Sequence, residues 1–182
     1  LSLAYQALGE WEQAKTAIEQ SQNTLQTLEP KSPLLVAKIL NTLGSLQLAI
    51  GQTEQALETW QQAEIAYRQG GDRVGAIGSQ INQSEALQTL GSYLRSRRIL
   101  EQINAELSTA PDDRLKSDSL RSLGGALQVI GDLQRARDTL EQSLEIAQQF
   151  DDGDRIGATL FSLGNTARNQ KDMSAALYYY QQ

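Results

Sequence analysis

The chain has 182 residues, with 16 basic and 22 acidic side chains, and its formal net charge is −6. It contains no cysteine and no histidine, which excludes disulfide bonds and zinc sites built from Cys and His. An acidic chain without a basic cluster is a poor candidate for binding nucleic acid, because neutralising phosphates supplies most of that affinity. No apolar run in the sequence approaches the roughly 18 residues that a membrane span requires.

Apolar residues recur at helical spacing along the whole sequence. The three prolines, at positions 30, 33 and 111, fall between the helical stretches. Capping patterns mark several helix starts, namely Ser32 before Pro33, Asp72, Asp112 or Asp113, and Asp154. The sequence therefore predicts helices, in chain order, at residues 1–8, 11–28, 34–50, 53–69, 73–90, 93–108, 113–130, 133–150, 154–170 and 173–182. It predicts no strand.

The sequence repeats itself about every forty residues. A turn recurs at Gly9, Gly51, Gly91 and Gly131, and then at Lys171, in steps of 42, 40, 40 and 40. A period in this range is typical of a solenoid, in which each unit buries its apolar face by stacking on its neighbours. The sequence predicts an all-α, right-handed superhelical solenoid of about four and a half antiparallel helix pairs.

Two small residues accompany each turn at fixed distances. One lies five residues after the turn, and the other lies seven residues before it. Glycine inside a helix costs about 1 kcal/mol relative to alanine, so a close helix contact is expected to compensate for it. The sequence predicts that the earlier small residue packs against the later one, as in Gly44 against Ala56, Gly124 against Ala136 and Gly164 against Ala176.

These half-motifs resemble the two helices of the tetratricopeptide repeat (TPR) family. Leu-x-x-Leu-Gly ending at residues 44, 124 and 164 is similar to its first helix, and Ala56-x-x-x-Trp60 is similar to its second. The resemblance implies a single repeat domain over residues 1–182, with repeats at about 1–30, 31–70, 71–110, 111–151 and 152–182. In the third repeat Gln80 and Gln83 replace the expected apolar pair, and we expect that helix to roll onto Ile77, Ile81, Ser84 and Leu87.

Two further features are the length of the repeats and the residues with which some of them begin. The period exceeds that of the common tetratricopeptide repeat by about six residues, and Gly-Asp-Arg-x-Gly openings occur at 71–75 and 153–157. Both are similar to the arrays of cyanobacterial proteins that end in a caspase-like CHAT domain. Because the chain begins at Leu1 inside a helical pattern, we also expect it to be a fragment of a longer array.

No pattern in the sequence indicates catalysis or a cofactor. Nucleophilic catalysis most often uses histidine as its base, and histidine is absent. The carboxylates of Asp151, Asp152 and Asp154 lack the spacing of a calcium loop and are expected to cap the next helix. Arginines 95, 97 and 98 are expected to be solvated on an outer helix, with Arg97 paired to Glu101. We therefore predict neither an enzyme nor a metal site.

The remaining candidate is a binding surface. The resemblance implies that the first helix of each repeat lines a concave groove, and helical spacing selects the side chains that share its inner face. The predicted partner-binding residues are Lys38, Asn41, Ser45, Glu85, Gln88, Arg121, Gln128, Phe161, Asn165 and Arg168. The same lining includes Leu48, Gly78, Ile81, Asp118, Gly125 and Ala158.

A polar groove with a few apolar anchors suits a protein or peptide segment, so the main prediction is a protein–protein interaction scaffold. The residues do not form the set that the family's carboxylate clamps use. Two alternatives stay open: a regulatory array that senses a small ligand and controls an attached effector, such as a CHAT protease domain, and a self-assembly module. We expect the last helix to fray or to pair end to end with another copy.

Overall fold

The computed structural model describes residues 1–26 and 32–182, which form ten α-helices and no strand. Each described helix end lies within one residue of its predicted position, and the predicted end of the second helix falls outside the described residues. None of the described helices combines the length and apolar character needed to cross a membrane. The helices are α1 (Ser2–Ala7), α2 (Trp11–Gln26), α3 (Pro33–Ala49), α4 (Thr53–Gln69), α5 (Arg73–Thr89), α6 (Tyr93–Leu107), α7 (Arg114–Val129), α8 (Leu133–Gln149), α9 (Gly153–Asn169) and α10 (Met173–Gln181).

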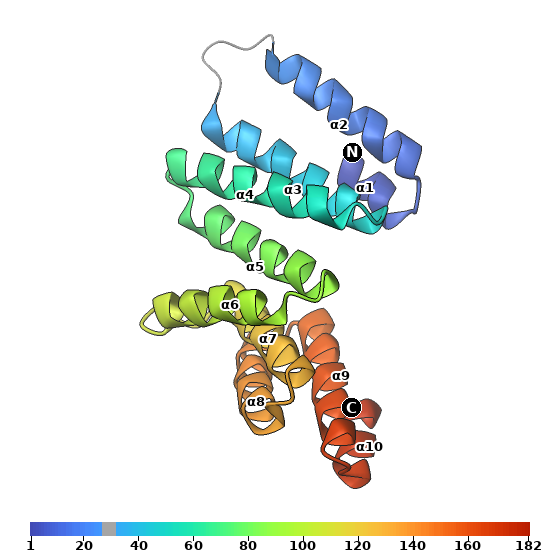
Figure 1. Cartoon of the computed structure of the whole chain (residues 1–182), viewed down its shortest axis with the longest axis vertical. Helices are drawn as coiled ribbons and strands as arrows, with labels where there is room; N and C mark the ends of the chain where they lie inside the picture. The colour runs from blue at the N-terminus through green and yellow to red at the C-terminus, as the bar shows by residue number, and fades with distance from the viewer. Residues whose placement is uncertain (27–31) are drawn as a thin grey trace. The chain divides into compact units, whose positions relative to one another are not determined.

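The helices form two compact units, Leu1–Gly91 and Ser92–Gln182. The boundary falls between the two helices of the third repeat. Within each unit every helix packs against its neighbours in the chain, and Figure 1 shows the antiparallel pairs α3–α4 and α7–α8. Odd-numbered helices also contact one another, as α3 does with α1 and α5, and α7 with α9. This pattern confirms the predicted all-α solenoid of helix pairs.

The recurring turn glycine has a backbone reason. At Gly131 φ is +86°, in the left-handed region that only glycine enters without steric cost. Its N–H donates to the carbonyl of Gln128, and the next N–H, of Asp132, donates to the carbonyl of Leu127, which closes α7 with a Schellman motif. Lys171 occupies the equivalent place before α10 with φ of +65°.

Aspartates cap four of the helices. The Asp72 carboxylate accepts a hydrogen bond from the N–H of Gly75 at 2.8 Å, and Asp113 accepts one from Lys116 at 2.8 Å. The predicted cap at Asp154 is wrong: α9 begins at Gly153, so Asp152 is its cap and Asp154 lies in the first turn. Ser32 precedes Pro33 at the start of α3 as expected, but its side chain makes no capping hydrogen bond.

The mid-helix glycines lie at close contacts, as predicted, but a different side chain fills the contact. A Cβ on Gly44 would lie 2.6 Å from Nε1 of Trp60, and one on Gly124 would lie 2.5 Å from Cγ of Leu140. A Cβ on Gly164 would overlap the ring of Tyr180. The nearest partner is therefore the residue one turn after the small alanine, and each glycine provides the space for it. At Gly124 the predicted contact with Ala136 is also present, because the carbonyl oxygen of Ala136 would lie 3.3 Å from the added Cβ.

The third repeat corrects part of one prediction. Ile77, Ser84 and Leu87 are buried as expected, and Ile81 is half-buried. The helix does not roll away from its glutamines, however, because Gln83 is also buried, with 5% of its surface exposed. The carboxylate of Glu64 on α4 accepts hydrogen bonds from Gln83 at 2.8 Å and from Gln80 at 2.9 Å. This acceptor satisfies the buried amides, so α5 keeps the register of the other repeats.

Candidate functional site

The ten predicted partner-binding residues all lie on odd-numbered helices, five in each unit. In the first unit they lie on α3 and α5, and in the second on α7 and α9, which are contacting pairs of helices. None is fully buried. Lys38, Glu85, Phe161 and Arg168 are exposed, whereas Asn41, Ser45, Gln88, Arg121, Gln128 and Asn165 are half-buried.

In the first unit a pair of asparagines connects α3 and α5. The Asn82 side-chain amide donates to Oδ1 of Asn41 at 3.1 Å. The main-chain carbonyl of Asn41 also accepts hydrogen bonds from Nε1 of Trp60 and from the hydroxyl of Ser45, each at 3.2 Å. Asn82 was missed from the sequence, although its separation from Asn41, close to one repeat, is a usable signal.

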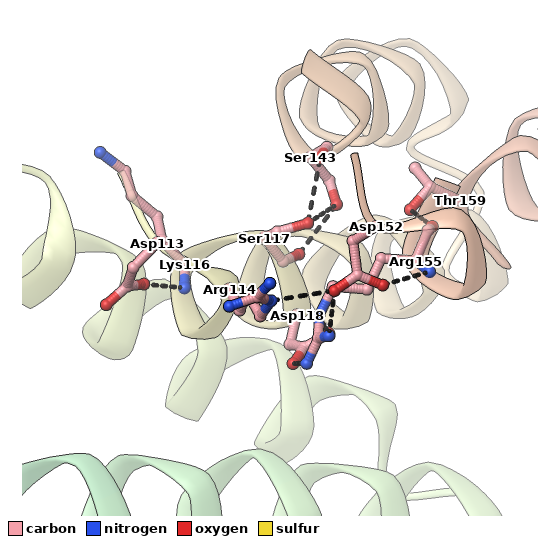
Figure 2. Close-up of polar contacts among 9 residues, drawn as sticks. All are labelled: Asp113, Arg114, Lys116, Ser117, Asp118, Ser143, Asp152, Arg155 and Thr159. Atoms are coloured by element: carbon pink, nitrogen blue, oxygen red, sulfur yellow. Dashed lines mark hydrogen bonds and ion pairs between the residues drawn. The ribbon is translucent and has the colours of Figure 1, made fainter. Parts of the chain in front are cut away.

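In the second unit an ion-pair network connects α7 and α9 near their N-terminal ends. Arg155 donates to both carboxylate oxygens of Asp118, at 3.0 and 2.7 Å, and also to Asp152 at 2.7 Å. Arg114 donates to Asp152 at 3.0 Å from the other side (Figure 2). A paired guanidinium and carboxylate in this two-pronged geometry fixes orientation as well as distance. The network thus sets the register of α7 against α9.

The same network shifts two pKa values. Hydrogen bonds from Arg114 and Arg155 hold the pKa of Asp152 below the ordinary value of an aspartate. The hydrogen bonds to Asp118 raise the pKa of Arg155 further above neutrality. Both of these charges therefore persist across the physiological pH range. Asp118, which was expected to line the groove, forms an ion pair with Arg155.

A pair of buried serines holds α7 against α8 (Figure 2). The hydroxyl of Ser117 donates to the carbonyl of Ser143 at 3.0 Å, and the hydroxyl of Ser143 donates to the carbonyl of Ser117 at 2.8 Å. Two repeats earlier the equivalent positions are Ala37 and Ala63, both fully buried in one core cluster. This second small-residue contact was not predicted, although its members recur at intervals of 80 residues.

Beyond the network, the α7–α9 face carries an exposed aromatic side chain. Phe161 is 62% exposed, and its ring centroid lies 6.0 Å from that of Tyr180 on α10. The Tyr180 hydroxyl donates to Oδ1 of Asn165 at 2.8 Å, which positions the ring beside this face. Arg121 and Arg168 have no ion-pair partner among residues 1–26 and 32–182.

Of the two charged clusters set aside from the sequence, the acidic one has a structural role. Asp152 is engaged by arginines, and Asp151 takes the left-handed turn position with φ of +49°. In the part of the chain that is described, no group of three acidic side chains is placed to hold a metal ion. Arg97 pairs with Glu101 at 3.7 Å, which confirms that prediction, while Arg95 and Arg98 are exposed on α6.

Comparisons with known proteins address the fold. Residues 115–182 match the family model described as tetratricopeptide repeat. Comparison with curated proteins gives no match. Three solved structures at 13–18% identity are similar to the chain. BtubC from P. vanneervenii has a TM-score of 0.80 at 18% identity, over the whole of this chain and 74% of that one. RapI in its apo form has a TM-score of 0.82 at 16% identity, over 99% of this chain and 65% of that one.

The third structure is a Rap protein complexed with Competence and Sporulation Factor. It has a TM-score of 0.85 at 13% identity, over 99% of this chain and 50% of that one. The chain thus spans half the length of this Rap protein. At such identities the likeness concerns the fold alone.

Proposed function

We propose that this chain, which has the tetratricopeptide-repeat fold and carries the family's repeats in residues 115–182, binds a protein or peptide segment through its odd-numbered helices. The observation that carries the proposal is the pairing between those helices. Asn41–Asn82 and Asp118–Arg155 fix neighbouring odd-numbered helices to one another, while nearby side chains on the same helices stay exposed.

The chemistry of these faces suits an extended or helical segment. Amides such as Gln128 and Asn165 can pair with main-chain polar groups, and Phe161 offers an apolar anchor. The arginines add charge-assisted contacts, and aromatic residues and arginine are the side chains that most often dominate interface energy. The five predicted residues of each unit therefore stand as the proposed binding surface of that unit.

The proposal is tested with a displayed library of random peptides selected on the intact chain. Selected peptides are then measured by fluorescence polarisation against Arg121→Ala, Arg168→Ala and Gln128→Ala. We expect weaker binding with little loss of stability, because surface changes usually stay within about 0.5 kcal/mol.

The matched control replaces Arg95, Arg97 and Arg98 on α6 by alanine together. It should leave peptide binding unchanged. If this triple replacement abolished binding while the variants on α7 and α9 were silent, the even-numbered helices would be the binding surface and the proposal would fail.

A regulatory role is the second candidate, and the likeness to a Rap protein complexed with Competence and Sporulation Factor favours it. In this reading ligand binding controls an attached effector, and a CHAT protease domain, to whose arrays the repeats are similar, is one example of such an effector. The two readings differ in ligand size, so titration with short peptides and with larger folded partners separates them. We assign the chain no catalytic step in either reading.

Self-assembly is the third candidate. It is favoured by α10, where Met173, Leu177 and Tyr178 are each more than half exposed. Light scattering across a range of concentrations tests it directly.

A further inference from the structure

The exposed side of α10 carries an apolar stripe. Met173, Leu177 and Tyr180 recur at helical spacing on this side and are 59%, 58% and 43% exposed. Within residues 92–182, all of which are described, α10 packs closely against α9 alone (Figure 1). The position of Tyr180 is buried in every earlier repeat, where it is occupied by Ile18, Trp60, Leu100 and Leu140. The α10 stripe is therefore a stacking face that no helix of its own unit covers.

A second apolar stripe lies on α1. Leu1, Ala4 and Leu8 share one side of this helix, and all three are exposed. The position of Ala4 is buried in every later repeat, where it is occupied by Leu46, Ala86, Ala126 and Thr166. On α5 this residue, Ala86, shares a core cluster with Trp60 of the preceding helix α4. The α1 stripe thus has the register of a face that packs on a preceding even-numbered helix.

Contacts within the two units show how these stripes fit each other. Gln83 on α5 donates to the main-chain carbonyl of Trp60 at 3.4 Å, and Gln170 after α9 donates to that of Leu133 at 3.2 Å. Repeat equivalence converts these contacts, and that of Ala86 with Trp60, into Leu1 with Tyr180, Leu8 with Met173, and Ala4 with Tyr180. The α1 stripe therefore runs antiparallel to the α10 stripe in matching order, and every converted pair is apolar on both sides.

We infer that α1 of one copy of this chain stacks on α10 of another copy, as α5 stacks on α4 within the first unit. The inference rests on the third candidate function, self-assembly, and names its contact. Such a head-to-tail contact does not close on itself, so further copies add to the same two faces. Because α1 has six residues and α10 has nine, the contact belongs to the small, transient class of interfaces.

The test is sedimentation velocity of the intact 182-residue chain from about 5 to about 500 µM, because association depends on concentration. The weight-average sedimentation coefficient of the wild type should rise over this range. Leu177→Glu and Leu8→Glu should each weaken association at least tenfold, because each would bury an unpaired charge in the contact. Ile65→Glu is the matched control. Ile65 lies on α4 and is 57% exposed, and its replacement should change association by less than 1.5-fold.

A mixture of the two variants tests the head-to-tail arrangement. Leu177→Glu keeps the α1 stripe, and Leu8→Glu keeps the α10 stripe. Each variant alone should remain monomeric, whereas their equimolar mixture should form a one-to-one dimer that grows no further. Formation of this dimer also shows that both variants fold. Two-fold pairing of α10 with α10 predicts instead that Leu8→Glu dimerises alone.

The inference is overturned if Leu8→Glu associates by itself, if the mixture stays monomeric, or if 500 mM NaCl abolishes wild-type association, since an apolar contact is not screened by salt. Failure of the self-assembly candidate looks different. If the wild type associates but ignores both substitutions, only this contact fails. If the wild type stays monomeric at every concentration, both fail. Neither result affects peptide binding by the odd-numbered helices, which is measured with its own variants.

Discussion

Replacing Gly124 by alanine should destabilise the second unit, even though alanine is the better helix former. A Cβ at this position would lie 2.5 Å from Cγ and 2.7 Å from Cδ2 of Leu140, and 3.3 Å from the carbonyl oxygen of Ala136. Carbon atoms pack at about 3.5–4.0 Å, so Leu140 would have to move by roughly 1 Å. Leu140 has no exposed surface and therefore no free space to enter.

Overpacking of this kind costs about 1–3 kcal/mol, against which the helix propensity of alanine returns about 1 kcal/mol. Gly157 provides the matched control, because it lies inside α9, is exposed, and would have no atom within 4 Å of an added Cβ. Gly157→Ala should stabilise the chain by up to about 1 kcal/mol. The two alanine variants should therefore differ by about 1–3 kcal/mol, and Gly124→Leu should cost more than Gly124→Ala.

Urea unfolding followed by circular dichroism measures these differences. The double variant Gly124→Ala with Leu140→Ala tests the cause, because shortening Leu140 removes the overlap. It should be at least about 1 kcal/mol more stable than the sum of the single effects. Equal stabilities for Gly124→Ala and Gly157→Ala, or additive effects in the double variant, would show that the contact with Leu140 does not require glycine.

Three further predictions concern the ion pairs and the turn. Arg155→Gln should cost about 1 kcal/mol, since the paired groups are partly exposed, and the loss should shrink in 0.5 M NaCl; a loss independent of salt would contradict an ionic origin. The lowered pKa of Asp152 means that its contribution to stability is present above the ordinary aspartate pKa and is lost as pH falls through the folded-state pKa. The urea-unfolding free energies of wild type and Asp152→Asn should therefore converge as pH is lowered below the ordinary value of about 3.9. Lys171→Gly should stabilise the chain by about 0.5–1 kcal/mol in thermal unfolding, because relief of the left-handed backbone at φ of +65° outweighs the added chain entropy; a lower melting temperature would refute this.

The sequence predicted the helices closely because their signals are local. Helical spacing of apolar residues and a glycine at each turn determine where a helix runs and where it ends, and both can be read within one repeat. The glycine at position 131 is explained by its own backbone conformation alone. The cap of α9 was misplaced because three aspartates compete within four residues, and only the folded chain shows that Asp152 accepts the hydrogen bond.

Contacts between helices were predicted less well, because they depend on side-chain length and direction. The register of Gly44 and Gly124 was correct, but the side chains that fill the space are Trp60 and Leu140 rather than the small alanines. The buried position of Gln83 could not be anticipated without Glu64, which lies on another helix and supplies the acceptor. A polar residue is acceptable in a core only when such a hydrogen-bond partner is present. The sequence pattern of a single repeat does not show that partner.

Prediction of the candidate surface from the sequence was limited in the same way. Helical spacing placed the ten residues on the odd-numbered helices, but it could not distinguish charges that are free from charges already paired. Asp118 and Arg121 are three residues apart on one helix, yet the first is neutralised by Arg155. The sequence shows that Asp118 and the start of the next odd-numbered helix are about one repeat apart. It does not show how the side chains are oriented.

The two units connect their odd-numbered helices with different kinds of polar contact, and this has a consequence for binding. A neutral amide pair links α3 to α5, whereas charged pairs link α7 to α9. Salt and acid should therefore loosen the odd-numbered helices of the second unit more than those of the first. Arg121 and Arg168, two of the proposed binding residues, lie on those same helices, whose register Arg155 and its two carboxylates stabilise. A ligand that binds these two arginines through charged groups would weaken with salt for two reasons, direct screening and loss of helix register. Arg155→Gln separates them, because it removes the register while leaving both ligand-binding charges intact.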